Sequence, residues 1–218
     1  MPIRDYPMLL KEKGIGYLAK RIYRAMIGRI WERTECELLL WTVPPYSSIL
    51  PEGFDIEFRS VSKAEARTLI DAEIAIPPAI LEERFSKDMR MYGVMFDGKI
   101  TEYVWAAGPP FYRETSSGFS MALEEDEIFY FDYKGIIRKR PDAFRHFILM
   151  KAFTDFCMVK EQERTGIKLK FYSLVSTKNK ISLKFHYEHL NATYCDRVVQ
   201  YRFLFTKWAR SRRFGLMK

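Results

Sequence analysis

The sequence has few cysteines, and their spacing matches no disulfide or metal-binding framework. Cys36, Cys157 and Cys195 are odd in number and far apart, which excludes a disulfide-rich secreted domain and shows no zinc-ligand spacing. We therefore predict three reduced thiols in a cytoplasmic protein and no metal site. Cys157 falls within an apolar helical pattern, where a buried small side chain is favoured over a nucleophile.

Long apolar runs are also missing. The longest candidate, Leu38–Trp41, is the length of a short strand, whereas a membrane-spanning helix needs roughly 18 apolar residues. Charged residues interrupt the first thirty positions, so we expect no secretory leader. The 218 residues are 48% hydrophobic and 16% aromatic, which excludes a disordered chain and allows one sizeable core.

Negative charge is scarce at the two ends of the chain. Residues 1–33 carry a net charge of +5 and residues 201–218 carry +6, which leaves −3 for the middle within the total of +8. A nucleic-acid surface is typically a continuous basic face with interleaved aromatics or a known motif, and the sequence shows neither. We therefore expect no nucleic-acid partner.

The basic N-terminal segment has a helical hydrophobic pattern. Apolar residues follow a helical stride between Lys and Arg side chains. These residues are Ile15, Leu18, Ile22, Met26 and Ile30. Because Gly14, Gly16 and Gly28 weaken a free-standing helix, a helix packed on the body is the favoured interpretation. The alternative is a basic amphipathic helix that contacts an anionic membrane, with the protein peripheral at the inner face.

Local patterns predict a regular order of elements from residue 54 onward. Ser62 and Glu65 form a capping-box pattern, and Asp97-Gly98 is a strong hairpin signal. Alternating or β-rich runs predict strands at Cys36–Val43, Phe54–Arg59, Met91–Phe96, Ile100–Ala107, Glu127–Tyr133, Ile167–Val175 and Thr193–Phe205. Helical periodicity predicts helices at about Lys63–Glu73, Pro78–Phe85, Phe144–Val159 and Lys178–His189.

This order predicts an α+β fold. Three antiparallel strands followed by strand, helix, strand, helix and strand give a mixed, mostly antiparallel central sheet with helices on both faces. We divide the chain into an N-terminal helix and short strand appendage at 1–50, the sheet domain at 51–205 and a basic C-terminal tail at 206–218.

One local motif carries a family resemblance. Asn179-x-x-Ser182 is followed by Phe185-His186-Tyr187-Glu188-His189-Leu190. With the order of elements over about 54–205, it resembles the GNAT superfamily of acyl-CoA-dependent N-acyltransferases. The family has Asn-x-x-Ser/Ala leading into Tyr-Glu-Lys-Leu-Gly-Phe. Counting from Asn179, Tyr187 comes one residue late here, and Asn191-Ala192 stands in place of Gly-Phe.

A second match is the basic turn before the long helix. The family pattern Arg/Gln-x-x-Gly-x-Gly/Ala holds the CoA pyrophosphate on backbone N–H groups at a helix N-terminus. Arg138-x-x-Pro141-x-Ala143 keeps the first and last positions, and Arg140-x-x-Ala143-x-Arg145 is the other register. Pro141 removes one N–H donor, which ion pairs from the basic side chains would partly offset.

The resemblance implies how an acyl thioester would be held. The donor, acetyl-CoA or another acyl-CoA, would be bound by Gly135, Ile136, Ile137, Arg138, Lys139, Arg140, Ala143, Phe144 and Asn179. Backbone groups at 135–137 would polarise the thioester oxygen, and Tyr187 would protonate the leaving thiolate. His186 would take that role if the register differs by one residue, and a packed aromatic is the alternative for Tyr187.

Carboxylates near the middle strands are the candidates for a general base. Asp132 and Glu127 are the choices, and Glu102 is a third candidate. Asp132 interrupts the aromatic run 128–133, where burial would raise the pKa of its carboxyl. A hydrogen-bonded structural aspartate is the alternative there.

Two classes of function remain open. The first is acyl transfer from a thioester to an amine of a small-molecule or envelope-related acceptor, with acyl-CoA or an acyl carrier protein as donor. The second is a non-catalytic scaffold, because the pyrophosphate turn lacks its central glycine. No Gly-x-Ser-x-Gly, Walker or His-Glu-x-x-His motif offers another chemistry. An open cleft between the strands that start at Glu127 and Ile167 would favour the enzyme, whereas side chains filling it would favour the scaffold.

Overall fold

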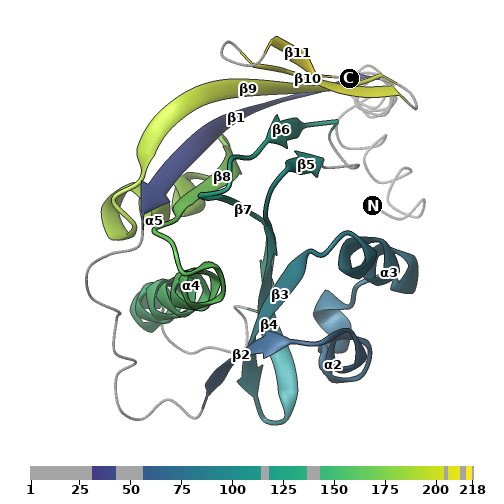
Figure 1. The fold of residues 1–218 in the computed structure, drawn as a ribbon, viewed down its shortest axis with the longest axis vertical. Helices are drawn as coiled ribbons and strands as arrows, with labels where there is room; N and C mark the ends of the chain where they lie inside the picture. Colours follow the sequence, from purple (N-terminus) through teal and green to yellow (C-terminus); the bar gives the residue numbers. More distant parts are fainter. Residues whose placement is uncertain are drawn as a thin grey trace, which may run out of the picture.

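The computed structural model describes residues 31–42, 56–113, 118–136, 143–203, 206–211 and 215–217 (Figure 1). Nine strands of this described part form one sheet in the order β11-β10-β9-β1-β8-β7-β4-β3-β2, and β5 pairs with β6 separately. The helix predicted before residue 31 and the basic turn at 138–141 lie outside the described residues.

The elements have the following bounds. The large sheet consists of β1 (Trp31–Thr42), β2 (Glu57–Val61), β3 (Arg90–Phe96), β4 (Lys99–Ala107), β7 (Glu127–Gly135), β8 (Lys170–Ser176), β9 (Thr193–Phe203), β10 (Thr206–Ser211) and β11 (Gly215–Met217). The small sheet consists of β5 (Phe111–Arg113) and β6 (Ser120–Ala122). The helices are α2 (Lys63–Leu69), α3 (Pro78–Ser86), α4 (Ala143–Thr165) and α5 (Lys180–His189), with a 3-10 turn, η2, at Ala72–Ile74.

Short-range signals set several of these boundaries. The Ser62 hydroxyl accepts from the Glu65 N–H, and the Glu65 carboxylate accepts from the Ser62 N–H at 2.8 Å, so the predicted capping box opens α2. Pro78 stands at the first position of α3, where its missing N–H costs nothing. Asp97 and Gly98 turn β3 into β4 with φ values of 49° and 68°, as a tight hairpin requires.

The direction of the strands matches the predicted class. Among the described strand pairs of the large sheet, all are antiparallel except β7 with β8. A parallel pair needs a crossover connection, which the 23-residue helix α4 supplies. The prediction of an α+β fold with a mixed, mostly antiparallel sheet is therefore confirmed. From β2 onward the predicted elements occur in the predicted order, and the short strands β5 and β6 and the strands β10 and β11 occur in addition.

The first strand lies inside the sheet, which differs from the expected N-terminal appendage. β1 pairs with β8 on one side and with β9 on the other. The physical reason is burial on both faces, because Leu38 belongs to one hydrophobic core and Leu39 and Trp41 belong to the core on the opposite face. The described parts of the predicted tail likewise form β10 and β11, which extend the sheet beyond β9.

Helices cover both faces of the sheet, as predicted. Ala66 of α2 and Leu81 of α3 enter the core on one face, whereas Phe153 of α4 and Phe185 of α5 enter the core on the other. Figure 1 shows these two helix pairs on opposite sides of β7 and β4, with β1 and β9 curving over them. None of the helices in the described ranges is both long and apolar enough to cross a membrane.

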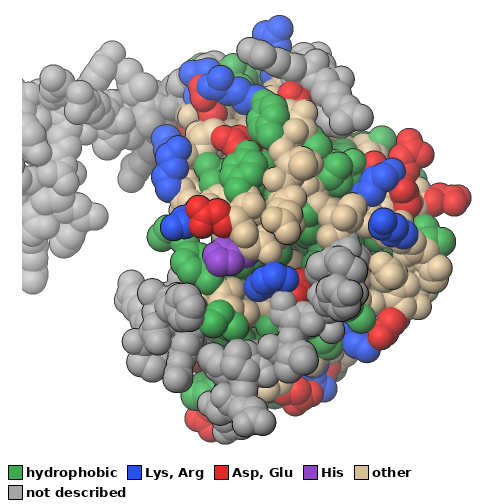
Figure 2. Space-filling model, turned by 90° about the vertical axis from the view of Figure 1, so that its left-hand side faces the viewer, with side chains coloured by type: hydrophobic (Ala, Val, Ile, Leu, Met, Phe, Trp, Pro, Cys, Tyr) green, Lys and Arg blue, Asp and Glu red, His purple; other side chains and the backbone are tan. Residues whose placement is uncertain are grey.

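The described surface carries mixed charge on the face that Figure 2 shows. Basic and acidic side chains are interspersed there with apolar ones. This agrees with the small net charge counted for the middle of the chain.

A buried carboxylate ties α4 to β3. Glu161 is fully buried and accepts hydrogen bonds from Arg90 Nε at 2.5 Å and from the Tyr92 hydroxyl at 2.8 Å, and Arg164 pairs with it at 3.0 Å. Because a buried carboxylate is costly without such partners, this cluster resists any sliding of the helix along the sheet. The face of α4 that looks toward β7 and β8 is thereby held in place.

Candidate functional site

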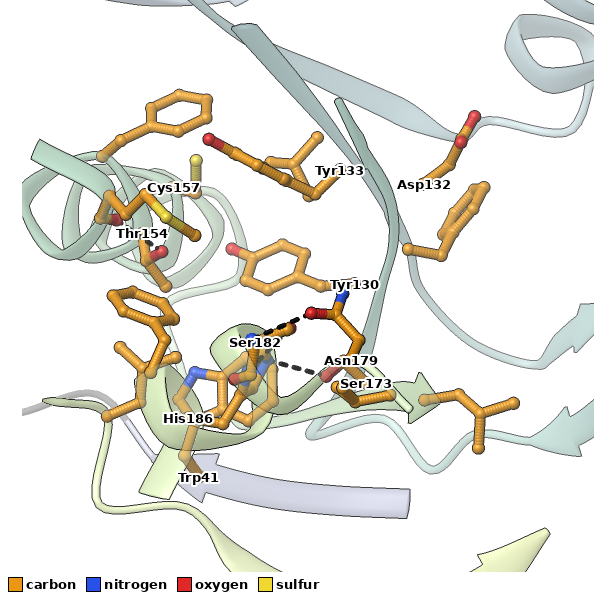
Figure 3. A pocket seen from close by; sticks show the side chains of 18 of the residues that line it. Trp41, Tyr130, Asp132, Tyr133, Thr154, Cys157, Ser173, Asn179, Ser182 and His186 are labelled. Carbon is orange, nitrogen blue, oxygen red and sulfur yellow. Dashed lines mark hydrogen bonds between the residues drawn. The ribbon is translucent and has the colours of Figure 1, made fainter. Parts of the chain in front are cut away.

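A cavity forms where β7 and β8 separate. The two strands pair in parallel from Glu127↔Lys170 to Tyr130↔Ser173. Both strands continue beyond that point but no longer pair with each other. There they bound a cavity of about 280 Å³, which α4, α5 and single residues of β1 and β4 also line (Figure 3). The predicted cleft between these strands is therefore present, and side chains of the described residues do not fill it.

A β-bulge in β7 coincides with this separation. The register with β4 shifts between Tyr103 and Trp105, so that Asp132 and Tyr133 of β7 stand opposite the single residue Val104. Asp132 has a φ of 51°, a left-handed conformation that Asp tolerates better than most residues. A bulge bends a strand and re-aims its side chains. Figure 3 shows the result, with Tyr133 directed toward α4 and Asp132 directed to the other side of β7.

The cavity combines apolar walls with a few polar groups. Its aromatic side chains are Trp41, Tyr130, Phe131, Tyr133, Phe153 and Phe185. Its polar side chains are Asp132, Thr154, Ser173, Ser176, Asn179, Ser182 and His186. An apolar cavity with a small number of convergent polar groups is typical of a ligand site.

Cys157 also lines this cavity, and it behaves as the sequence predicts for a buried thiol. Its side chain is fully buried, and this burial raises the pKa of the thiol well above its ordinary value. The thiol is therefore protonated at neutral pH and is a poor nucleophile. All three cysteines are free thiols, as predicted.

His186 is the polar residue with the best-defined geometry in the cavity. Its Nδ1 lies 2.7 Å from the carbonyl oxygen of Ser182, and its Nε2 lies 3.0 Å from the Ser173 hydroxyl oxygen. The ring stands edge-on to Trp41, with ring centroids 5.2 Å apart. Burial lowers the pKa of His186, so the neutral imidazole is favoured near pH 7.

Tyr187, the predicted acid for the leaving thiolate, lies outside the residues that line the cavity. It is 38% exposed, and its hydroxyl donates a hydrogen bond of 2.5 Å to Glu37 of β1. Partial burial and this hydrogen bond raise the pKa of Tyr187 to about 12. One residue along an α-helix turns a side chain by about 100°, so the one-residue shift of the motif places His186 in the cavity instead.

The three candidate carboxylates occupy different environments. Asp132 lines the cavity and pairs with Arg84 of α3 at 2.6 Å. Glu127 lies where the strands still pair, and it accepts from the Tyr172 hydroxyl at 2.9 Å. Glu102 is fully buried and accepts from the Tyr133 hydroxyl at 2.7 Å. Of the three, Asp132 is the one among the residues that line the cavity, and its carboxylate points to the α3 side of β7.

The ion pair of Asp132 sits between two aromatic rings. The Arg84 guanidinium lies 5.0 Å from the ring centroids of both Trp105 and Phe131. The cation–π contacts and the ion pair with Asp132 thus fix the position of the Arg84 side chain. The Arg84–Asp132 ion pair consequently lies on the α3 side of β7, at the bulge.

The predicted donor-binding residues fall into three groups: one in the cavity, one at the end of β7, and one around the start of α4. Asn179 lines the cavity and caps α5, where its side chain accepts from the Ser182 N–H at 3.1 Å. Gly135 ends β7, and a Cβ there would lie 2.7 Å from the Glu102 side chain, so a side chain does not fit. Ile136 is buried, and its N–H donates to the Thr101 carbonyl at 3.1 Å, so this amide is already used within the protein.

The remaining predicted donor-binding residues are at the start of α4 or in the segment that precedes it in the sequence. Ala143 and Phe144 form its first turn. Ile137, Arg138, Lys139 and Arg140 lie outside the described residues.

Ser173 and Trp41 were not singled out by the sequence reasoning. Ser173 occupies a core-facing position of β8, because Phe171 and Val175 on either side of it in the alternation belong to the core beneath α4 and α5. The sequence signal for Ser173 was a hydroxyl at an inward position of an otherwise apolar strand face. Trp41 carried no comparable signal, since its place depends on where β1 enters the sheet.

Comparison with known proteins places the resemblance at the level of fold. No protein-family model and no curated protein sequence matches the chain. Solved structures do resemble it, among them a Drosophila protein at 9% identity and a TM-score of 0.52, which matches 88% of this chain. The chain spans 59% of that protein's length.

Other similar structures carry N-acetyltransferase names. A GCN5-related N-acetyltransferase-like protein from Streptococcus suis is 15% identical, with a TM-score of 0.46 over 93% of this chain and 76% of that one. A predicted acetyltransferase from Clostridium acetobutylicum, solved with acetyl-CoA, is 11% identical, with a TM-score of 0.37 over 59% of this chain and 86% of that one. At these identities the similarity concerns fold alone, and it assigns no family or activity to this chain.

Proposed function

We propose that this protein transfers an acyl group from acyl-CoA to an amine, with the acylated arm of the donor in the cavity between β7 and β8. The observation that carries the proposal is the cavity itself, which lies between two parallel strands that stop pairing after Tyr130 and Ser173. A non-catalytic scaffold predicts a filled cleft, so the cavity counts against that alternative.

The size and lining of the cavity suit the thioester end of the donor. A volume of about 280 Å³ is near the lower end of the roughly 300–1,000 Å³ of small-molecule sites. It therefore suits an acyl-pantetheine arm better than a whole nucleotide. Its aromatic walls would exclude water, and the unpaired strand edges would offer backbone N–H groups to polarise the thioester oxygen.

The acceptor amine must lose a proton to become a nucleophile. Asp132 is the base that we propose for this step, because it lines the cavity from the α3 side of β7 and Arg84 holds it in place. The amine would then enter the cavity from the α3 side of β7. Positioning of the two reactants in this way supplies a large part of the rate in acyl transfer.

Isothermal titration of the full chain with acetyl-CoA and longer acyl-CoAs tests the donor. We expect binding, and we expect Ser176→Trp, which places a large ring at the cavity end of β8, to abolish it. Lys184→Trp on the outer side of α5 is the matched control, because Lys184 is exposed and does not line the cavity. Absence of binding for every acyl-CoA, or equal binding by the Ser176→Trp variant, would contradict the proposal.

An acyl carrier protein is the second donor that we propose to test, because the run Arg138-Lys139-Arg140 would complement an acidic partner. Binding of an acylated carrier protein should weaken steeply as salt concentration rises. Binding that does not respond to salt would favour acyl-CoA alone.

A further inference from the structure

Ser173 and His186 meet at the closed end of the cavity. Ser173 is the last residue of β8 that pairs with β7, so it lies at the point where the two strands separate. His186 lies on α5, one turn after Ser182, and reaches Ser173 with its Nε2 at 3.0 Å. Figure 3 shows Ser173, Ser182 and His186 grouped beside Tyr130 at this end of the cavity.

The hydrogen bonds define which nitrogen of His186 carries the proton. The Ser182 carbonyl, 2.7 Å from Nδ1, is an acceptor and has no proton to give. Nδ1 is therefore protonated, and in the neutral ring Nε2 is a bare acceptor. The Ser173 hydroxyl then donates its proton toward Nε2, which is the arrangement that a general base makes with a nucleophile.

The surroundings keep His186 in this state. Burial lowers the pKa of His186 below its ordinary value, so the unprotonated ring predominates at neutral pH. The indole of Trp41 packs edge-on against the imidazole and restrains its rotation. A hydroxyl, an imidazole and a carbonyl that orients the imidazole are thus in contact in one cavity, which is the arrangement that an activated nucleophile needs.

Packing alone gives no reason for a hydroxyl at this position. Phe171 and Val175 occupy the same face of β8 and are buried in the apolar core, and α5 already packs on the sheet through Leu183 and Phe185. A buried hydroxyl costs free energy relative to an apolar side chain of similar size unless it is hydrogen-bonded. The hydroxyl meets this requirement through His186, and it places in the cavity an oxygen that an apolar residue would not supply.

We infer that Ser173 is a nucleophile that accepts the acyl group from a thioester, with His186 as its general base. This inference rests on the proposed function for the identity of the donor. It adds a covalent acyl-serine stage to the transfer, and it predicts thioester hydrolysis when no amine is present.

The step balances in atoms and electrons. The Ser173 Oγ forms a bond to the thioester carbonyl carbon while its proton moves to His186 Nε2. The carbon–sulfur bond breaks, and the leaving thiolate takes the proton from Nε2. An amine or water then attacks the serine ester and gives a proton to Nε2, and the released Ser173 Oγ recovers that proton.

A fluorophosphonate, which forms a stable bond to activated serine hydroxyls, tests the pair without any CoA compound. We expect one adduct per chain by intact-protein mass spectrometry, located by peptide mapping to Ser173. Ser173→Ala should remove the adduct, and His186→Gln should slow labelling by about 10²–10⁴-fold. Ser86→Ala is the matched control, because Ser86 is an exposed residue at the end of α3 whose hydroxyl bonds to its own helix.

Ser173→Cys keeps the test decisive if the alanine variant fails to fold. The thiol should react with an activated ester to give a thioester at residue 173, and the additional His186→Gln substitution should slow that reaction. A wild-type chain that forms no adduct, or forms it at another residue, overturns the inference. So does a Ser173→Ala variant that folds and transfers acyl groups to amines at the wild-type rate, and in that case the proposed function still stands. Labelling of Ser173 in a chain that binds no acyl-CoA supports the pair and contradicts the proposed donor.

Discussion

The two faces of the sheet meet the cavity with different chemistry. On the α5 face, His186 and Ser173 form a partly buried, neutral pair. On the α3 face, Arg84 and Asp132 form an ion pair flanked by aromatic rings. The contrast follows from which face each side chain occupies, because Asp132 on β7 points to the α3 face whereas Ser173 on β8 contacts His186 of α5. Under the proposed function, the acyl group would lie beside the neutral pair and the amine beside the charged pair.

Removing the base on the α5 face should have the largest effect. We expect His186→Gln to lower kcat for acyl transfer by about 10²–10⁴-fold, because a positioned general base contributes about that much. The Kd of the donor should change little, since the glutamine keeps a polar side chain of similar length. Steady-state kinetics and titration together measure the two effects.

Tyr187→Phe tests the residue next to His186 on α5 and is compared with His186→Gln. Its hydroxyl bonds to Glu37 outside the cavity lining, so we expect a loss smaller than tenfold. A loss for Tyr187→Phe that equals the loss for His186→Gln would restore the tyrosine as the acid predicted from the motif.

Breaking the charged pair on the α3 face should act mainly on stability. Arg84→Met leaves a partly buried carboxylate without its partner, so the free energy of unfolding should fall by roughly 1–3 kcal/mol. Adding Asp132→Asn should recover part of that loss, and urea denaturation of the four chains in the cycle measures the coupling. Lys184→Met in the exposed pair with Glu188 is the control, with an expected change of about 0.5 kcal/mol or less.

Acidification should lower the free energy of unfolding by a smaller amount, through His186 on the α5 face. Because the pKa of His186 is lowered in the folded protein, the unfolded chain binds a proton more readily as pH falls through about 6.5. The stabilisation that neutral His186 provides is complete above that pH and is lost progressively below it. His186→Gln should flatten this part of the stability curve between pH 5 and 8, and an unchanged curve would show that His186 titrates normally.

Short-range patterns allowed much of the fold to be predicted. The capping box at Ser62 and Glu65, the turn at Asp97-Gly98 and the alternation of the strands each act over a few residues, and each is present in the structure. The Asn179-x-x-Ser182 motif likewise forms a local cap, with the Asn179 side chain on the Ser182 N–H.

Parts of the candidate site depend on contacts that no local pattern encodes. His186 was named only as the substitute for Tyr187, because a one-residue uncertainty in a helix changes which side chain faces the cavity. Arg84 and Asp132 are 48 residues apart in sequence, and their pairing depends on how α3 packs on the bulged strand. Asp132, which the sequence offers as a base candidate, is among the residues that line the cavity, and its role as a base stays a prediction.

The sequence by itself determined most of the elements and their order, because hydrophobic period, caps and turns are short-range properties. Tertiary structure alone decided that β1 enters between β8 and β9, that β7 and β8 stop pairing at Tyr130 and Ser173, and that Ser173 meets His186. These features arise from pairing and packing between residues far apart along the chain, and each brings together groups whose chemistry is unremarkable until they are in contact.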